Sequence, residues 1–395
     1  MDRIILHIDV NSAFLSWSSI KLLQSGYKKD IRNEISVIAG NPKKRHGIIV
    51  AASIPAKKMG IKPPINLLDA RKIYKDIIVV PPDYYFYKKC SLNLMNYIKS
   101  LFPIVEQYSI DECYVDYTGM NTLYGNEVDF AYKLKDNIYK KFGFTVNIGI
   151  GNNKLSAKMA SDFEKPNKVH TLYEYEFKEK VWNLDISNLF MAGKSSCKKL
   201  RELNINTIGE LANSDKDLIY RNLKSLGLML HDYANGIDNS KLSTESYIER
   251  KGIGYSKTLE EDTENISEIY KYLKVFSKNI SNELKRRKLY ASTLVVTIRT
   301  NDFKTTNHQK KYTNSFCHED DIYSKSITIF KELWDLEPIR LIGLRVTDFT
   351  ENNSYQLSLF DETNQKENEI DKIIDNLNSK LGNNLLYKGS KLKKK

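Results

Sequence analysis

Residues 3–24 read RIILHIDVNSAFLSWSSIKLLQ, and this stretch contains the two elements on which the fold assignment rests. The first eight residues are mostly apolar, which predicts a buried strand over 3–10. The apolar residues from Ala13 onward have helical spacing and predict a helix over 13–24. A strand that leads directly into a helix is typical of a sheet covered by helices. Asp9 is the one carboxylate in this strand, and it lies close to the strand end.

Strands and helices continue to alternate after this first pair. Predicted strands lie at 35–39, 47–52, 103–109, 113–117 and 144–151, of which the third and fourth form a hairpin. Predicted helices lie at 54–60, 84–100, 125–142 and 154–163, followed by short helices over 170–238. After a polar linker the pattern predicts a helix at 264–288, a strand at 291–300, a helix at 320–334 and a strand at 340–349. We therefore expect an α/β (α+β) multidomain chain with an antiparallel or mixed sheet covered by helices.

The composition narrows the class of protein without identifying it. The chain has 395 residues, which corresponds to two to four domains, and a net charge of +12, which favours a polyanionic partner. Most basic residues are lysine, however, and a biased codon usage also produces such a composition. No apolar run is long enough to span a membrane, and Met1–Arg3 leads straight into a strand rather than a secretion signal. The four cysteines are scattered, which argues against a disulfide scaffold and against zinc.

Three acidic residues lie at the ends of predicted strands. Asp9 ends the first strand, and Asp111 and Glu112 lie at the tip of the predicted hairpin. A buried carboxylate is costly without a cation, and clustered oxygen ligands suit Mg²⁺. Two such ions could hold the attacking and leaving oxygens of a phosphoryl displacement. The alternative is that these residues are helix caps or surface acids.

Two further segments carry residues suited to phosphate. Val10–Ala13 lead into the N-terminus of a helix, whose amides favour an anion such as a triphosphate. Lys57 and Lys158 could neutralise its charge, although single lysines usually line a solvated surface. At 189–212, a turn that contains Gly193 joins short helices and resembles a helix-hairpin-helix motif, although ordinary helical hairpins also contain glycine.

The polar C-terminal segment contains one apolar peptide. Residues 356–360 read QLSLF, and apolar side chains exposed in a tail favour docking into a hydrophobic groove. The alternative is a short strand that packs back onto its own domain.

Taken in order, these motifs resemble the Y family of DNA polymerases, the translesion class that includes bacterial DNA polymerase IV and the catalytic subunit of polymerase V. The resemblance spans residues 3–360. It rests on IDVNSAF (8–14), VAASIPAKKMG (50–60), YSIDECYVD (108–116), GIGNNKLSAKMAS (149–161), KPN (165–167), KGIGYSKTL (251–259), QLSLF (356–360) and the helix-hairpin-helix. One departure concerns residues 54–57: many members have Tyr-x-Ala-Arg there, whereas this chain has Ile-Pro-Ala-Lys. Lys57 keeps the charge but lacks the bidentate fork of arginine, which puts the tightness of nucleotide binding in doubt.

The resemblance implies a right-hand polymerase with a mixed or antiparallel palm sheet, small fingers, a helix-hairpin-helix thumb and an α+β little finger domain. The implied boundaries are 1–10 and 77–168 for the catalytic palm, 11–76 for the fingers, 169–238 for the thumb, 239–246 for a linker, 247–350 for the DNA-binding little finger and 351–395 for a flexible tail.

The resemblance also implies roles for individual residues. The metal-binding carboxylates would be Asp9, Asp111 and Glu112, together with the main-chain carbonyl of Val10. Phe14 would be the steric gate, an aromatic ring that collides with a ribose 2′-OH. Contacts to the nucleotide would come from Val10, Asn11, Ser12, Ala13, Phe14, Lys57 and Lys158. Contacts to DNA would come from Gly193, Lys194, Lys198, Lys199, Lys251, Lys257, Arg299 and Lys304. The clamp-binding peptide would be Gln356, Leu357, Ser358, Leu359 and Phe360.

The implied activity is low-fidelity translesion DNA synthesis, in which a primer 3′-OH attacks a dNTP and pyrophosphate leaves. The implied cofactor is Mg²⁺, two ions, with Mn²⁺ as a substitute. The implied partners are primer–template DNA, dNTP and a sliding clamp, and we expect a cytoplasmic, nucleoid-associated monomer without a membrane contact. Two alternatives are a catalytically silent clamp adaptor, which would be expected to lose the three carboxylates, and a nucleotide cyclase, which needs neither the helix-hairpin-helix nor the clamp peptide. The lesion bypassed, and a polymerase IV-like or polymerase V-like role, are left open.

Overall fold

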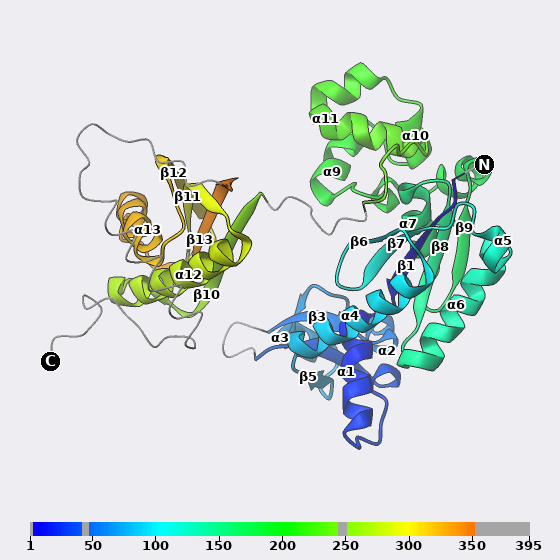
Figure 1. Ribbon diagram of the computed structural model, residues 1–395, viewed down its shortest axis with the longest axis horizontal. Coiled ribbons are helices and arrows are strands. Elements are labelled where there is room, and N and C mark those ends of the chain that lie inside the picture. Colours follow the sequence, from blue (N-terminus) through cyan, green and yellow to red (C-terminus); the bar gives the residue numbers. More distant parts are fainter. Residues whose placement is uncertain (1–2, 42–46, 244–250, 352–395) are drawn as a thin grey trace. The chain divides into compact units, whose positions relative to one another are not determined.

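The computed structural model describes residues 3–41, 47–243 and 251–351. The chain divides into two compact units, Met1–Glu249 and Arg250–Lys395 (Figure 1). The peptide at 356–360 and the tail at 361–395 lie outside the described residues. Within the described part of the chain, no helix combines the length and the apolar character that a membrane crossing requires.

The larger sheet of the first unit has β1 (Ile5–Val10) as its central strand. The strand order is β6-β7-β1-β8-β9. The other four strands are β6 (Val105–Gln107), β7 (Glu112–Asp116), β8 (Val146–Gly151) and β9 (Val169–Leu172). All neighbouring pairs are antiparallel except β8 and β9, which are parallel. The predicted mixed sheet and the predicted hairpin are therefore confirmed.

Different helices cover the two faces of this sheet (Figure 1). Successive side chains of a strand point to opposite faces. Leu6, Ile8 and Val10 belong to the core shared with α4 (Tyr84–Leu101) and α6 (Glu127–Phe142). Ile5, on the other face, clusters with Ala157 of α7 (Lys154–Asp162). His7 and Asp9 share the face of Ile5, so α7 packs on the face that carries Asp9.

A glycine in β8 allows α7 to pack this closely. A Cβ atom at Gly149 would lie 2.0 Å from the carbonyl oxygen of Ala157 and 2.4 Å from the backbone nitrogen of Ser161. No side chain fits at such distances, because real Cβ contacts stay beyond about 3 Å. Gly149 therefore sets the distance between α7 and the sheet.

A smaller sheet with the order β4-β3-β2-β5 lies between α1 and α4 in the sequence. Its strands are β2 (Ser36–Ala39), β3 (Ile48–Ala52), β4 (Ile65–Asn66) and β5 (Ile78–Val80). Its helices are α1 (Ala13–Gln24), the 3₁₀ turn η1 (Ile31–Asn33), α2 (Ile54–Lys58) and α3 (Leu67–Ile73). The helix expected after Ser53 is confirmed, because the Ser53 side chain caps α2 by accepting a hydrogen bond from the Ala56 nitrogen at 3.1 Å.

Short helices follow β9, as expected. They are α8 (Glu174–Val181), the 3₁₀ turn η3 (Ile186–Asn188), α9 (Lys194–Glu202), α10 (Ile208–Ala212) and α11 (Lys216–Ala234), and one further short helix, α5 (Asn121–Tyr124), precedes α6. Their core includes Leu155 and Met159 of α7, so this helical part is continuous with the larger sheet through α7.

Over residues 251–351, the second unit forms a four-stranded antiparallel sheet with two helices. The strand order is β10-β13-β11-β12, so β10 and β12 are the edge strands. The elements are β10 (Gly252–Thr263), α12 (Ile266–Arg287), β11 (Tyr290–Thr300), β12 (Thr305–Phe316), α13 (Glu319–Leu333) and β13 (Ile339–Thr350). Both helices share one core with Leu294, Val296 and Ile298 of β11, which leaves the opposite face of the sheet without a helix among the described residues.

Five strands were missed by the sequence analysis, including the short β4 and β5 of the smaller sheet. β9 occupies the beginning of a stretch where short helices were expected, and β10 and β12 were not predicted as strands at all. The implied boundaries at 76 and 168 each fall just before a strand: β5 pairs with β2 in the smaller sheet, and β9 pairs with β8 in the larger one.

Candidate active site

The ladder of the larger sheet brings two of the three predicted carboxylates face to face. Asp9 is registered directly opposite Glu112 of β7. Asp111 is the residue before β7, and its carbonyl oxygen accepts a hydrogen bond from the Val10 nitrogen at 3.1 Å. Asp9 is only 6% exposed. The end of β1 and the start of β7 therefore form one acidic site.

Ser109, which the sequence analysis did not single out, fixes the hairpin that carries Asp111 and Glu112. The Ser109 hydroxyl donates to Asp111 Oδ1 at 2.7 Å. Ser109 Oγ also accepts hydrogen bonds from the backbone nitrogens of Asp111 at 3.2 Å and of Glu112 at 3.1 Å. These three hydrogen bonds hold the bend that allows two neighbouring carboxylates to serve one site.

Lysine side chains pair with the carboxylates. Lys158 Nζ lies 3.1 Å from Glu112 Oε1 and 3.5 Å from the Asp162 carboxylate. Lys165 pairs with Asp9 and also lies 2.7 Å from Asp162. Lys158 was predicted to contact a nucleotide, and the structure places its ammonium at the acidic site. Lys165 and Asp162 were not predicted, although Lys165 belongs to the KPN motif at 165–167.

Burial and charge shift the pKa values of these groups in different directions. Burial raises the pKa of Asp9, against the opposing charge of Lys165. Burial likewise raises the pKa of Asp111, against its hydrogen bond with Ser109. Burial acts the same way on Glu112, but His7 and Lys158 outweigh it and lower the pKa of Glu112 to about 2. Glu112 is therefore ionised at neutral pH.

The segment that follows β1 faces the same site. Ser12 has a left-handed conformation with φ of 47°, and it begins α1 without a capping hydrogen bond from its side chain. Lys57 Nζ donates to Ser12 Oγ at 3.0 Å. Burial, together with the nearby charge of Lys165, lowers the pKa of Lys57. Two ammonium groups from different elements thus lie near the start of α1, which is an arrangement suited to a polyphosphate.

Asn11 is held in a buried network rather than exposed to a ligand. Its Nδ2 donates to Asn147 Oδ1 at 3.0 Å, and its Oδ1 accepts from the Asn167 nitrogen at 2.9 Å. The Asn11 side chain therefore links β1 to β8 and to the segment after α7. Ala13 is buried and belongs to the core of the larger sheet.

Phe14 belongs to an aromatic cluster against α4. Its ring stacks on Tyr87 with 4.8 Å between centroids and 11° between planes. It also meets the edge of Tyr84 at 5.9 Å. Tyr87 is fully buried, and its hydroxyl is 2.6 Å from Ser18 Oγ. The Phe14 ring is thus held in place from one side by a rigid surface.

The donor set at the acidic site consists of oxygen atoms only. Three carboxylates and the Val10 carbonyl are the ligands that hard divalent cations prefer. Within residues 3–41, 47–243 and 251–351, no group of three or more His, Cys, Asp or Glu side chains is already arranged around a metal position. In this arrangement Lys165 pairs with Asp9 and Lys158 pairs with Glu112.

The predicted DNA contacts fall on two different parts of the chain. Gly193 precedes α9, and Lys194, Lys198 and Lys199 are exposed on it. The element before Gly193 is a 3₁₀ turn, η3, rather than the helix that was expected. In the second unit, Lys251 and Lys304 are exposed and lie outside the strand interiors.

The strand pairing of the second unit places its other two predicted DNA contacts on different faces of the sheet. Lys257 is opposite Ile342, which belongs to the core beneath the helices, whereas Arg299 is opposite Leu341. Successive residues of a strand face opposite sides, so Lys257 and Arg299 lie on different faces of the sheet. The helix-free face carries Arg299 together with Arg345 and Lys311, which were not predicted. No acidic residue occupies this face at the registered positions of 252–258, 293–299, 305–311 and 341–347.

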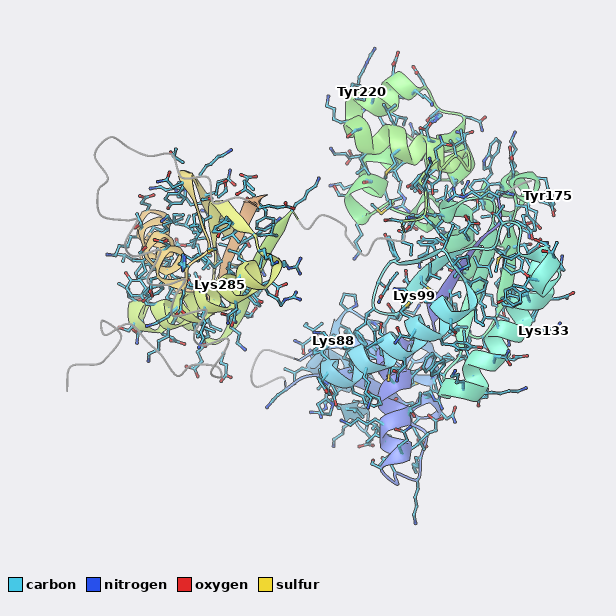
Figure 2. All side chains as sticks on the ribbon, in the orientation of Figure 1. Lys88, Lys99, Lys133, Tyr175, Tyr220 and Lys285 are labelled. Atoms are coloured by element: carbon cyan, nitrogen blue, oxygen red, sulfur yellow. The ribbon has the colours of Figure 1, made fainter. Side chains whose placement is uncertain are left out.

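Many other lysines lie on the outer faces of helices. Figure 2 labels Lys88 on α4, Lys133 on α6 and Lys285 on α12, and all three are exposed. The excess positive charge is therefore spread over the surface and does not by itself mark a site.

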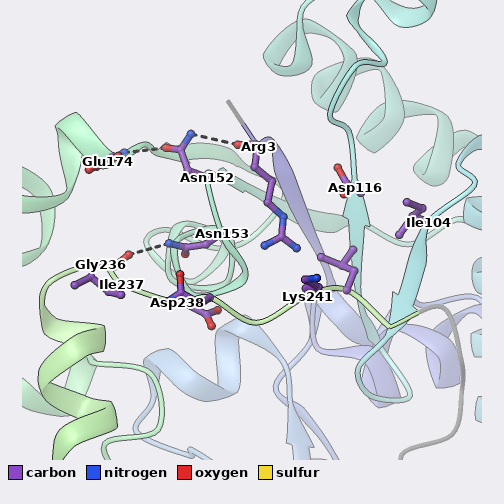
Figure 3. Close-up of a pocket in the computed structure, with 12 residues that line it drawn as sticks. Arg3, Ile104, Asp116, Asn152, Asn153, Glu174, Gly236, Ile237, Asp238 and Lys241 are labelled. Carbon is purple, nitrogen blue, oxygen red and sulfur yellow. Dashed lines mark hydrogen bonds between the residues drawn. The ribbon is translucent and has the colours of Figure 1, made fainter. Parts of the chain in front are cut away.

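A pocket of about 680 Å³ lies away from the acidic site (Figure 3). Arg3 and Asp116 line it, and they lie at the opposite ends of β1 and β7 from Asp9 and Glu112. The segment after α11 also lines the pocket, and Asn153 donates to the Gly236 carbonyl there at 2.8 Å. It is thus a separate feature of the first unit.

Comparisons with known proteins cover nearly the whole chain. Residues 8–162 match the impB/mucB/samB family, and residues 250–359 match the impB/mucB/samB family C-terminal domain. The chain is 44% identical to DNA polymerase IV of Clostridium acetobutylicum, over 100% of this chain and 99% of that protein. It is 32% identical to DNA polymerase IV 1 of Bacillus subtilis, over 99% of this chain and 94% of that protein. Among solved structures, a Y-family DNA polymerase chimera of Dbh and Dpo4 matches with a TM-score of 0.74 and 23% identity, over 88% of this chain and 100% of the other.

Proposed function

The chain belongs to the impB/mucB/samB family of Y-family DNA polymerases, and we propose that its polymerase site is built on Asp9, Asp111 and Glu112. It is a DNA-directed DNA polymerase that carries out translesion synthesis on DNA with dNTPs, and its reaction depends on a divalent metal ion. One observation supports the residue assignment above all others. The strand pairing sets Asp9 opposite Glu112, and Asp111 immediately precedes Glu112.

The oxygen donors at the end of β1 fit a hard divalent cation, and Mg²⁺ is the ion we propose, as a pair for which Mn²⁺ can substitute. Asp9, Asp111, Glu112 and the Val10 carbonyl would hold it. When bound, the metal supplies charge stabilisation at the attacking and leaving oxygens of the phosphoryl displacement. Glu112 is already ionised for this role because its pKa is about 2.

The lysines around the site would hold the triphosphate. Lys165 pairs with Asp9, and Lys57 contacts Ser12 at the start of α1. Cation binding at Asp9 would compete with the Lys165 ammonium, which would then be available to a phosphate oxygen. The backbone nitrogens of Ser12 to Phe14 would contribute hydrogen bonds, since the first amides of a helix have no partner within it.

Phe14 would act as the steric gate against ribonucleotides. Its ring is buttressed by Tyr87 and Tyr84, so it cannot easily give way to a 2′-OH. A gate of this kind needs a rigid backing, because a mobile ring would admit the larger sugar.

Two surfaces would hold the DNA backbone. One is the exposed start of α9 with Lys194, Lys198 and Lys199. The other is the helix-free face of the second unit, which carries Arg299, Arg345 and Lys311 and no acid at the registered positions. Cations without base-reading partners favour phosphate binding at any sequence, as a polymerase requires.

The QLSLF peptide at 356–360 would dock into a groove of a sliding clamp. We further propose that the protein acts as a monomer in the cytoplasm, in association with the nucleoid. These proposals rest on the sequence, since the peptide lies outside the described residues.

Primer extension with Mg²⁺ on an undamaged template and on a template with an abasic site tests the function. We expect insertion on both templates. A catalytically silent adaptor would extend neither primer. A polymerase without translesion activity would extend the first primer and stop at the abasic site.

A further inference from the structure

His7 lies beneath the acidic site, and apart from its effect on the pKa of Glu112 it has been given no role so far. Its side chain is fully buried and shares the face of Asp9, two residues earlier in β1. Its ring packs at 4.7 Å from the ring of Tyr114, its neighbour in β7. On the other side, His7 is registered opposite Gly149, the residue that allows α7 to approach the sheet.

The two ring nitrogens of His7 face different partners. Nδ1 is 2.8 Å from Ser161 Oγ of α7. Nε2 is 3.4 Å from Glu112 Oε2 and has no hydrogen-bond partner among the described residues. A buried nitrogen without a partner destabilises the fold, so a short movement of the carboxylate toward Nε2 would be favourable.

The hydroxyl of Ser161 decides which nitrogen carries the proton. It has one hydrogen and two acceptors within reach, the Lys158 carbonyl at 2.8 Å and His7 Nδ1 at 2.8 Å. If the hydroxyl donates to Nδ1, the neutral ring carries its proton on Nε2 and points it at Glu112. If the hydroxyl donates to Lys158 instead, two lone pairs face each other across 3.4 Å. The carboxylate favours the first arrangement, because an N–H donor stabilises its charge.

We propose that His7 is a positioning residue that donates from Nε2 to Glu112 Oε2 and fixes this carboxylate for the divalent ion. Lys158 already holds the other oxygen, Oε1, at 3.1 Å. Glu112 is then held at both carboxylate oxygens, by the ammonium of Lys158 and by the imidazole of His7. The proposal rests on the proposed role of Glu112 as a metal ligand.

Two substitutions at position 7 separate the two nitrogens. In His7→Gln the amide nitrogen takes roughly the place of Nε2, so the donor to Glu112 is kept. In His7→Asn the shorter amide takes the place of Nδ1, so only the contact with Ser161 remains. Both variants bury one polar amide and lose the same ring, so they differ mainly in the reach toward Glu112.

His170 provides the matched control. It lies in the same row of the sheet, since His7 is opposite Gly149 and Gly149 is opposite His170. Its Nε2 is likewise buried without a partner among the described residues, but its ring faces Phe163 at 6.0 Å. His170→Asn therefore removes a partly buried imidazole, with a buried Nε2, from the same row of the sheet.

The first measurement is of Mn²⁺ binding, which is detected by electron paramagnetic resonance. The full-length chain is used with dNTP and a primer that ends in a dideoxynucleotide, so no turnover occurs. We expect His7→Asn to weaken Mn²⁺ binding on the order of 10- to 100-fold, as is typical when the partner of a metal ligand is removed. His7→Gln and His170→Asn should stay within about threefold of the unaltered chain. Equal Mn²⁺ affinity for His7→Asn and His7→Gln would overturn the proposal.

The second measurement needs no substitution that alters folding. Nitrogen-15 NMR of the imidazoles in the full-length chain with Mg²⁺ reports which nitrogen carries hydrogen, and the His7 signals are assigned by their loss in His7→Gln. A proton on Nε2 supports the proposal, and a neutral ring protonated only on Nδ1 overturns it. Glu112→Gln distinguishes an error in the proposed active site from an error in the proposed role of His7. If this variant keeps full polymerase activity, the proposed site is wrong, whereas loss of activity with an unaffected His7→Asn variant refutes only the role of His7.

Discussion

At the scale of single residues, the ring of Phe14, the proposed steric gate, has a rigid backing. The ring stacks on the buried Tyr87 and cannot retreat into the core. We predict that Phe14→Ala raises the ratio of ribonucleotide to deoxynucleotide insertion by at least tenfold, because a clash worth more than about 1.4 kcal/mol is removed. Single-nucleotide insertion with matched rNTP and dNTP measures this ratio.

Tyr84→Ala is the control for this prediction. It removes an edge contact to Phe14 and leaves the ring in place on Tyr87. It should change the ratio much less than Phe14→Ala. An unchanged ratio in Phe14→Ala would mean that another group selects the sugar.

Asp30 gives a pH-dependent prediction. It accepts hydrogen bonds from Ser19 and from Arg32, and burial acts against these bonds. The net result lowers the pKa of Asp30 to about 2. A group with a lowered folded-state pKa stabilises the fold above its unfolded pKa of about 4, and this contribution is lost as the pH falls toward 2.

Asp30→Asn should therefore lower the melting temperature at pH 7, and the difference from the unaltered chain should shrink between pH 4 and pH 2. Thermal unfolding followed by circular dichroism over this range measures the effect. Asp69→Asn is the control, since among the described residues Asp69 is paired only with the exposed Lys72. A difference that stays constant with pH would show that Asp30 contributes through packing rather than charge.

At the scale of elements, the packing of α7 on β8 decides whether the site forms. Gly149→Ala would place a Cβ atom 2.0 Å from the Ala157 oxygen, so α7 must move away from the sheet. We predict a destabilisation of about 1–3 kcal/mol, as for other overpacked positions, and a loss of activity because Lys158 and Ser161 move with the helix. Thermal unfolding and primer extension measure the two effects.

Gly193→Ala is the matched control for this prediction. A Cβ atom at Gly193 meets nothing within 4 Å, and its backbone does not need glycine, with φ of −73°. It should leave the melting temperature nearly unchanged, and only this quantity is compared because Gly193 is a proposed DNA contact. If Gly149→Ala behaves in the same way, the approach of α7 does not set the site.

The elements that the sequence predicted well are those with strong local signals. α1 and α4 have apolar periodicity, and α4 begins with Asp83, which accepts from the Phe86 nitrogen at 3.0 Å. β10 and β12 were missed because both are edge strands of a sheet with one face free of helices, so their sequences are polar and lack a clear apolar alternation.

Part of the candidate site was also predictable from strong local signals in the sequence. Asp9, Asp111 and Glu112 could be proposed because strand ends and hairpin tips are visible in the sequence, and the structure places Asp9 opposite Glu112. His7 and Lys165 were not found, because their roles depend on how α7 and the segment after it pack on the sheet. The sequence does not show that Lys158 of α7 contacts Glu112 or that Ser161 of α7 contacts His7, because tertiary packing brings these residues together.

At the scale of the whole molecule, the net charge of +12 contributes to DNA binding mainly through the basic side chains that lie next to the DNA. Arg345 and Arg299 lie on the helix-free face of the second unit. We predict that replacing each by alanine weakens DNA binding at all sequences and lowers the slope of log K against log salt by about 0.9 per residue, or about 0.7 if the contact is to a single strand. Fluorescence anisotropy with labelled primer–template DNA over a salt series measures both.

Lys310→Ala is the control, because Lys310 is on the helix-covered side and pairs with Glu332. It should leave the salt slope unchanged. An equal effect of Lys310→Ala and Arg345→Ala would show that net charge, and not this face, binds the DNA.

The central claim is that one acidic site at the end of β1 and the start of β7 performs polymerisation, and single-turnover dNTP insertion by Asp111→Ala tests it most directly. Asp116→Ala is the control, because Asp116 lies at the other end of β7 and bonds only locally to the Thr118 nitrogen. We predict that Asp111→Ala loses at least on the order of 100-fold in the insertion rate while its DNA affinity stays unchanged, since a direct ligand matters more than its outer partners. Asp116→Ala should insert at nearly the unaltered rate. Insertion by Asp111→Ala at that same rate would contradict the account.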